Sequence, residues 1–144
     1  MEYASVAWDP HTRRNSDRVE RIQRGAARFV MGDYSRRSSV SSMLHCLEWP
    51  TLQERRLCSR LAMMYKIRHG LVDIPWCEFF SDCPSLSRTR GHGSRVLALH
   101  CRSSVYSGSF FPRTIRDWNV LPFDPASFGS LEGFKKELKN AGLG

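Results

Sequence analysis

The segment from Thr51 to Gly70 constrains the fold most, because it carries a full set of signals for one long helix. Thr51 and Glu54 have the spacing of a capping box, in which each side chain accepts a hydrogen bond from the other residue's amide. Gly70 is suited to a left-handed cap at the other end. Between them lies a broad apolar face, made of Leu57, Cys58, Leu61, Ala62, Met64 and Tyr65. Such a face packs against other elements, and we predict a mainly helical protein.

A second long helix is predicted from Asn15 to Met31. Asn15 or Ser16 is the candidate N-terminal cap, and Gly32 is the candidate C-terminal cap. Apolar residues form one stripe at helical spacing, which can pack against the rest of the chain. The stripe consists of Val19, Ile22, Ala26, Phe29 and Val30.

Arginines form a neighbouring stripe on the same helix, about a quarter-turn away, and this stripe is expected to stay in water. Two acidic residues, Asp17 and Glu20, each lie four residues before an arginine, at Arg21 and Arg24. At that spacing we predict surface salt bridges within the helix.

The remaining elements are shorter. Helices are predicted over 40–48, over 110–119 with Pro112 in the first turn, and after a cap at Ser130. Residues 3–8 resemble the last turns of a helix, and residues 81–94 have the composition of a loop. Residues 95–100 alternate as a short strand or hairpin would. We therefore predict a small helical bundle with a basic helical region (1–75), a loop-rich connection (76–108) and a C-terminal helical region (109–144), as one compact unit.

The charge of the chain is strongly positive, at +8, and it is uneven. Eighteen of the 22 cationic residues are arginine, whose planar, bidentate donor group suits phosphate. The first 72 residues hold 13 cations against 7 anions, so a polyanionic partner is expected on this half. Gene composition and a merely solvated cationic face are the alternatives. The candidate nucleic-acid-binding residues are Arg14, Arg18, Arg21, Arg28, Arg36, Arg37, Arg55, Arg56 and Arg60.

Residues that carry chemistry do not group into a catalytic or metal-binding pattern. Cys77 and Cys83 are separated by five residues, and no pair of histidines has the spacing of a zinc finger. A nucleophile elbow, a phosphate-binding glycine loop and closely set carboxylates for two metal ions are all absent from the sequence. We therefore expect no catalytic centre, no metal and no cofactor.

The sequence also bears on where the protein works. Its apolar runs are far shorter than the roughly 20 residues that span a bilayer, and the start lacks a signal-peptide pattern. Five cysteines are an odd number and are scattered, which is typical of reduced thiols. We expect an intracellular protein, in the cytoplasm, the nucleus or both, without a membrane partner.

Several runs of the sequence, taken in order, resemble a known family. They are Glu2-Tyr3-Ala4-Ser5 with Trp8-Asp9-Pro10; Glu20-Arg21-Ile22-Gln23-Arg24 with Ala26-Ala27-Arg28-Phe29; Leu47-Glu48-Trp49-Pro50-Thr51-Leu52 with Glu54-Arg55-Arg56; Met64-Tyr65-Lys66-Ile67 with Gly70-Leu71-Val72-Asp73-Ile74-Pro75; Arg88-Thr89-Arg90-Gly91-His92; and Ser109-Phe110-Phe111-Pro112-Arg113-Thr114-Ile115-Arg116-Asp117-Trp118-Asn119 with Leu121-Pro122. Their order and spacing resemble the C-terminal end of the reverse transcriptase of non-LTR (LINE, jockey-type) retrotransposons, over about residues 2–138.

The resemblance implies a place in the thumb, and in the helical region after it, of an RNA-directed DNA polymerase. In the family this region grips template–primer and element RNA. The Phe/Tyr-x-Asp-Asp turn with the metal-binding aspartates has no counterpart here, so no polymerase chemistry transfers to any residue of this chain. The implied partners are RNA or DNA, through non-specific phosphate contacts, and the missing upstream polymerase domain. Without that domain, the apolar stripe of the first long helix is expected to be exposed.

Two alternatives stay open from the sequence. One is a relic reading frame without a biochemical role, and the other is a helical protein-interaction module. An isolated enzyme fits least, because no catalytic constellation is present.

Overall fold

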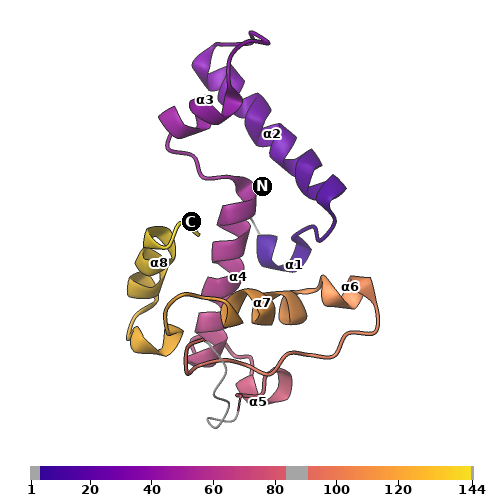
Figure 1. The fold of residues 1–144 in the computed structure, drawn as a ribbon, viewed down its shortest axis with the longest axis vertical. Coiled ribbons are helices and arrows are strands. Elements are labelled where there is room, and N and C mark those ends of the chain that lie inside the picture. Colours follow the sequence, from indigo (N-terminus) through magenta and orange to yellow (C-terminus); the bar gives the residue numbers. More distant parts are fainter. Residues whose placement is uncertain (1–3, 84–90, 144) are drawn as a thin grey trace.

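The computed structural model describes residues 4–83 and 91–143, and it confirms a mainly helical protein. Figure 1 shows α2 and α3 at one end of the molecule, while α7 crosses the lower part of α4 and α8 lies beside the middle of α4. The helices are α1 (Ser5–Trp8), α2 (Arg13–Met31), α3 (Val40–Cys46), α4 (Leu52–Arg68), α5 (Trp76–Phe79), α6 (Ser104–Ser107), α7 (Phe110–Asn119), the 3-10 turn η1 (Pro125–Ser127) and α8 (Leu131–Asn140).

Helix α4 is the central element and begins as predicted. The Thr51 hydroxyl accepts from the Glu54 amide at 3.2 Å, and the Glu54 carboxylate accepts from the Thr51 amide at 2.8 Å. Gly70, with a φ of 64°, is in the left-handed region that glycine adopts at low cost. Because α1, α2, α7 and α8 all pack on α4, its broad apolar face becomes the floor of the core.

The main core lies between α4, α7 and α8, and we call it the α4–α7–α8 core. Tyr65 stacks on Phe134 with ring centroids 4.8 Å apart, and Trp118 lies 5.9 Å from the same ring. The Tyr65 hydroxyl donates to the Phe128 carbonyl at 2.6 Å, so the polar tip of this buried ring is satisfied. The core therefore joins residues of the predicted 1–75 and 109–144 regions into one packed unit.

The segment expected to be a strand or hairpin forms only an isolated antiparallel bridge between Asp82 and Val96. Two backbone hydrogen bonds flank this bridge. The Cys83 amide donates to the Arg95 carbonyl at 2.9 Å, and the Leu97 amide donates to the Ser81 carbonyl at 2.7 Å. Of the predicted loop 81–94, residues 84–90 lie outside the described residues.

Helix α2 differs from the prediction in its start, and its apolar stripe faces outward. It begins at Arg13 after Thr12, whose side chain makes no capping hydrogen bond, so neither Asn15 nor Ser16 is the cap. The apolar stripe, which its spacing allows to pack against the rest of the chain, is largely exposed, as expected for this stripe without the upstream domain. Ile22 is 58% exposed, Phe29 76% and Val30 55%.

The reason lies in where α3 and the start of α4 dock on α2. Ala27 is buried against Met43 and Leu44 of α3 in a small cluster. Gln23 donates to the Pro50 carbonyl at 2.8 Å, so a polar side chain is also buried on this side. Ile22 is one residue away from Gln23 in sequence but about 100° away around the helix axis. The docked face therefore turns the apolar stripe outward.

Candidate nucleic-acid interface

The exposed arginines of α2 form the candidate interface. Arg14, Arg18 and Arg21 follow one another at spacings of four and three residues, so they lie along one side of the helix for about 10 Å. All three are exposed, and within residues 4–83 and 91–143 none of them has a salt-bridge partner. Arg13 and Arg24 are also exposed on this helix.

The two salt bridges predicted within α2 are missing from the ion pairs of the described residues. Glu20 turns instead toward the start of α4, where its carboxylate accepts from the Leu52 amide at 3.2 Å. This carboxylate is therefore engaged with backbone, and the positive charge of Arg21 and Arg24 is left facing water. Sequence spacing alone missed this, because the competing donor is 32 residues away.

Arg28, in the same helix, binds the backbone of the loop that follows α2. Its guanidinium donates to the carbonyls of Ser35 at 2.8 Å and Asp33 at 3.4 Å, beyond the glycine cap of α2. The Asp33 carboxylate is held by the Ser38 side chain and the Ser35 amide, and these hydrogen bonds lower its pKa. The loop ordered in this way carries Arg36 and Arg37, which are both exposed.

Arg56 and Arg60 lie in the interior and do not belong to an exposed phosphate-binding surface. Arg56 Nε is 2.8 Å from the Asp9 carboxylate, and Arg60 contacts the same carboxylate through its own guanidinium. Arg60 also donates to Asp117 at 2.7 Å, while Arg113 reaches Asp9 at 3.1 Å. Charges this deep are paired because a lone buried charge is very costly. Burial lowers the pKa of Arg60, and the hydrogen bond to Asp117 opposes this effect.

Asp9 is the centre of this ion network, and no local sequence pattern marks it as such. Its side chain is only 5% exposed, although it follows a short helix and precedes a proline. Most members of the network do come from runs that carry the family resemblance. These are Trp8-Asp9-Pro10, Glu54-Arg55-Arg56 and the run that holds Arg113 and Asp117. The network ties α1, α4 and α7 together.

A second polar cluster holds the segment 91–96 on α7. Trp118 donates from its indole to the Ser94 carbonyl at 2.9 Å, and a ring nitrogen of His92 lies 2.9 Å from the Trp118 carbonyl. The Asn119 side chain bonds both backbone groups of Val96, at 2.9 and 2.7 Å. His92 of the 88–92 run and Trp118 of the Trp118-Asn119 run are thus joined by a hydrogen bond between a side chain and a backbone carbonyl.

Serine, histidine and aspartate occur together in this cluster, but not in the order that activates a nucleophile. The Ser94 hydroxyl donates to Asp124, and His92 directs Nδ1 toward that carboxylate at 4.0 Å. A nucleophile needs its hydrogen bond to the base, and here the serine is bound to the carboxylate instead. Burial alone would raise the pKa of Asp124, but hydrogen bonds from Ser94 and the Ala126 amide leave it below its ordinary value.

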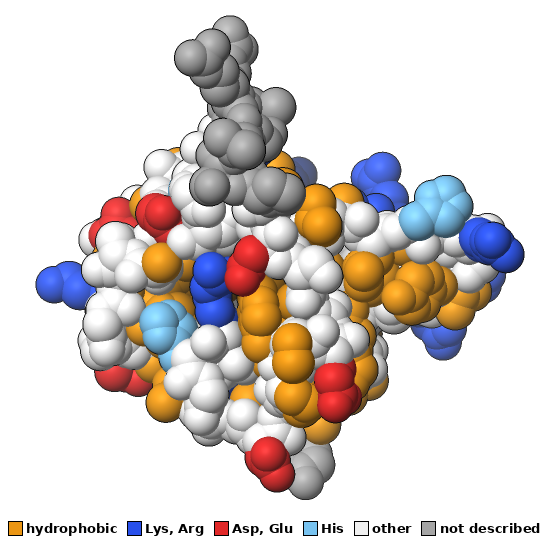
Figure 2. Space-filling view, turned by 90° about the horizontal axis from the view of Figure 1, so that it is seen from below, with side chains coloured by type: hydrophobic (Ala, Val, Ile, Leu, Met, Phe, Trp, Pro, Cys, Tyr) orange, Lys and Arg blue, Asp and Glu red, His pale blue; other side chains and the backbone are white. Residues whose placement is uncertain are grey.

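The cations are distributed unevenly over the molecule. The α2 arginines and the 36–37 pair lie at the end formed by α2 and α3 (Figure 1). On the face seen from the opposite end, few Lys and Arg side chains occupy the middle, where hydrophobic and uncharged groups predominate (Figure 2). A polyanion would therefore meet the densest positive charge on α2.

Metal-binding clusters and membrane-spanning helices are also absent from the described residues. In the ranges 4–83 and 91–143, no three His, Cys, Asp or Glu side chains are grouped to hold a metal ion. No helix in these ranges has the length and hydrophobicity needed to cross a bilayer. Comparison with protein-family models, curated proteins and solved structures finds no match to this chain.

Proposed function

We propose that this chain is the nucleic-acid-binding C-terminal part of a non-LTR (LINE, jockey-type) retrotransposon reverse transcriptase, and that it binds RNA or DNA through phosphate contacts. The ordered runs of the sequence support the family assignment. The observation that carries the binding function is the row of Arg14, Arg18 and Arg21 on α2, exposed and without a carboxylate partner among the described residues.

The chemistry of this row suits a phosphate backbone. Guanidinium groups bind phosphate oxygens through paired donors, and such contacts carry no base preference. The ordered loop at Arg36 and Arg37 extends the cationic surface past the end of α2. Aromatic side chains do not alternate with these arginines, so base stacking is not part of the proposal.

The test is a salt titration of binding to fluorescent single-stranded RNA and to duplex DNA of matched length. We expect binding that weakens steeply with salt, because each phosphate contact releases counterions. Arg18→Glu with Arg21→Glu should weaken binding about a hundredfold at low salt and flatten the salt dependence. A complete lack of binding by the natural chain at low salt would contradict the proposal.

A matched control separates the α2 surface from net charge. Arg102→Glu with Lys136→Glu changes the charge equally at two other exposed positions. If this control loses as much binding as the α2 variant, the effect belongs to overall charge and the α2 interface is wrong.

A second function, protein interaction, is favoured by the exposed apolar stripe of α2. Ile22, Phe29 and Val30 are the type of contiguous apolar surface that marks a contact with another protein. In the proposed context the partner is the upstream polymerase domain. Binding of that domain in trans, lost on Ile22→Gln with Phe29→Ser, would support this function, and undiminished binding would oppose it.

The place of action is proposed to be inside the cell. All five cysteines are free thiols, which fits a reducing compartment. Oxidised glutathione should then form mixed disulfides with exposed Cys46 and Cys77 by thiol–disulfide exchange, with release of reduced glutathione and without any gain in stability.

A further inference from the structure

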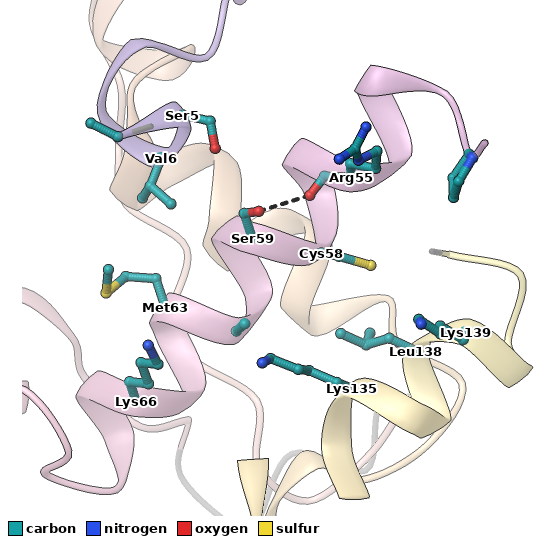
Figure 3. A pocket seen from close by; sticks show the side chains of 13 residues that line it. Ser5, Val6, Arg55, Cys58, Ser59, Met63, Lys66, Lys135, Leu138 and Lys139 are labelled. Carbon is teal, nitrogen blue, oxygen red and sulfur yellow. Dashed lines mark hydrogen bonds between the residues drawn. The ribbon is translucent and has the colours of Figure 1, made fainter. Parts of the chain in front are cut away.

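A groove separate from the α2 arginines runs along α4, between α1 on one side and α8 on the other. Its floor is one stripe of α4 at helical spacing, and its volume is about 600 Å³. Figure 3 shows Ser5 and Val6 of α1 on one side of the stripe and Lys135, Leu138 and Lys139 of α8 on the other. The α4 residues of the floor are Arg55, Cys58, Ser59, Ala62, Met63 and Lys66.

The middle of the groove carries no charged side chain, and two of its floor residues have small side chains. Ala62 and Ser59 are small, so another backbone can approach α4 closely there. Met63 on the floor and Val6 of α1 provide half-buried aliphatic surface, and methionine adapts its shape to varied apolar partners. The Ser59 hydroxyl donates to the Arg55 carbonyl at 2.9 Å, so it is satisfied within α4 and adds no competing polar group.

The rim of the groove is cationic at several points. Arg55 and Lys66 stand at the two ends of the floor, eleven residues apart, which is about 16 Å along a helix. Lys135 and Lys139 stand one turn apart on α8, and Lys135 extends toward α4 (Figure 3). Lys135 also pairs with exposed Glu132 at 3.2 Å, a surface contact that costs little to exchange.

Negative and aromatic groups are missing from this lining. Of the described residues that line the groove, none is acidic and none is aromatic. Glu54 raises the pKa of Cys58 only as a minor contribution beside burial, and its carboxylate is engaged in the capping box. The groove therefore attracts anions but offers no ring on which a nucleobase could stack.

We infer that the α1–α4–α8 groove binds an acidic amphipathic peptide helix, whose aliphatic side chains enter the middle while its carboxylates meet the cationic rim. The spread of the cations favours this occupant, because a fatty acid carries its charge at one end only. The apolar side chains in the middle of the groove favour it over a nucleic acid, whose backbone has no apolar side chains to place there. The inference does not depend on the proposed nucleic-acid binding.

The test uses the full chain and a fluorescent synthetic helix of about 14 residues, with leucine at every third or fourth position and glutamate elsewhere. One matched peptide has glutamine in place of glutamate, and a second has the same composition in scrambled order. We expect saturable binding of the first peptide, and about tenfold weaker binding of each of the other two. Equal binding of all three, or of none, overturns the inference.

Variants locate the binding on the groove. Lys135→Glu with Lys139→Glu on α8 should weaken peptide binding about tenfold. Lys66→Glu, on the opposite helix α4, should also weaken peptide binding. Arg102→Glu with Lys136→Glu is the charge-matched control and should leave binding unchanged. If both groove variants bind normally, or if the control loses as much as they do, the groove is not the site.

Cys58 provides a local reporter, because it lines the groove and its thiol donates to the Leu143 carbonyl at 2.8 Å. Bound peptide should slow alkylation of Cys58, read by peptide mapping, without slowing exposed Cys46 or Cys77. Unchanged alkylation of Cys58 at saturating peptide overturns the inference. RNA that slows alkylation of Cys58 in the natural chain, but not in the Lys135→Glu, Lys139→Glu variant, also overturns the inference. The groove would then be a nucleic-acid-binding surface.

Nucleic-acid binding by α2 and peptide binding by the groove can be disproved independently. Arg18→Glu with Arg21→Glu should keep peptide binding while it loses RNA or DNA binding. The reverse pattern is expected for Lys135→Glu with Lys139→Glu.

Discussion

The α4–α7–α8 core and the α2–α3 lobe (residues 13–46) are built in opposite ways. The core buries aromatic and aliphatic side chains from three helices and satisfies its charges in an internal ion network. The lobe buries only Ala27, Met43 and Leu44 as a cluster, and it leaves its largest apolar side chains in water. Hydrophobic burial thus stabilises one region, while the other depends on a few polar tethers to α4.

This contrast explains how one chain can present two kinds of surface. A helix that is not committed to a core can expose both a cationic row and an apolar stripe, as α2 does. Helix α4, at the centre of the core, offers the stripe that forms the groove floor, and the ends of this stripe are cationic. Regions with few buried contacts also open most easily, so we expect the lobe to be the less stable part.

The largest effect is expected in the core, from Phe134→Ala. The ring is fully buried between Tyr65 and Trp118, so its loss should lower the free energy of unfolding by about 4 kcal/mol. Chemical denaturation measures it. Phe29→Ala removes the same group from the lobe surface and should change stability by less than about 0.5 kcal/mol. Similar losses in the two variants would mean that α2 is packed by its apolar stripe.

The next effect is expected from Asp9→Ala at the centre of the ion network. Removing this carboxylate leaves Arg56 and Arg60 buried without their shared partner, which should cost about 3 kcal/mol. The change is read from the denaturation midpoint at neutral pH. Asp17→Ala, at an exposed carboxylate of α2 without a salt bridge in the described residues, is the control and should be nearly neutral. A neutral Asp9→Ala would show that the network contributes nothing.

A smaller and local effect is expected from Gln23→Ala in the lobe. The variant loses the hydrogen bond to the Pro50 carbonyl and should make opening of α2 and α3 easier by about 1 kcal/mol. Native-state hydrogen exchange should show faster exchange over 13–46 and unchanged exchange in α4 and α7. Uniform acceleration across the chain would mean that the lobe and the core open together.

The smallest effect is a pH dependence from Asp124 at the edge of the core. Its folded pKa is lowered below the ordinary value of 3.8, so its stabilising contribution is present above that value and is lost as the pH falls through the folded pKa. The stability difference between the natural chain and Asp124→Asn should therefore shrink as the pH is lowered below about 4. Denaturation at a series of pH values measures it, and a difference that grows on acidification would contradict the assignment.

Local signals in the sequence predicted the longer helices and most of their ends, but they did not predict the one-turn helices α5 and α6 in the 76–108 connection. The capping box at Thr51 and Glu54, the left-handed glycines Gly32 and Gly70 at two helix ends, and the Ser130 cap are all present in the structure. Each depends on residues within a few positions of one another, so the information is contained in a short stretch of chain. The start of α2 was missed, because the candidate cap Ser16 donates to the Pro10 carbonyl instead.

The candidate interface was predictable only in part. Arg14, Arg18 and Arg21 are exposed as expected, whereas Arg56 and Arg60 are buried beside Asp9. Arginines in a helix have the same sequence signature in both situations. The carboxylate that distinguishes them comes from another element, 51 residues away for Arg60.

The sequence by itself determined which segments form the longer helices, where most of these helices end, and that the positive charge is concentrated in the first half. Only the tertiary structure decided which side of each helix is covered. On α2, docking of α3 and α4 onto Gln23 and Ala27 exposes the apolar stripe. On α4, packing of α1 and α8 leaves one stripe open as a groove. Periodicity fixes the relative angles of side chains around an axis, but the direction of burial depends on surfaces that come together from distant parts of the chain.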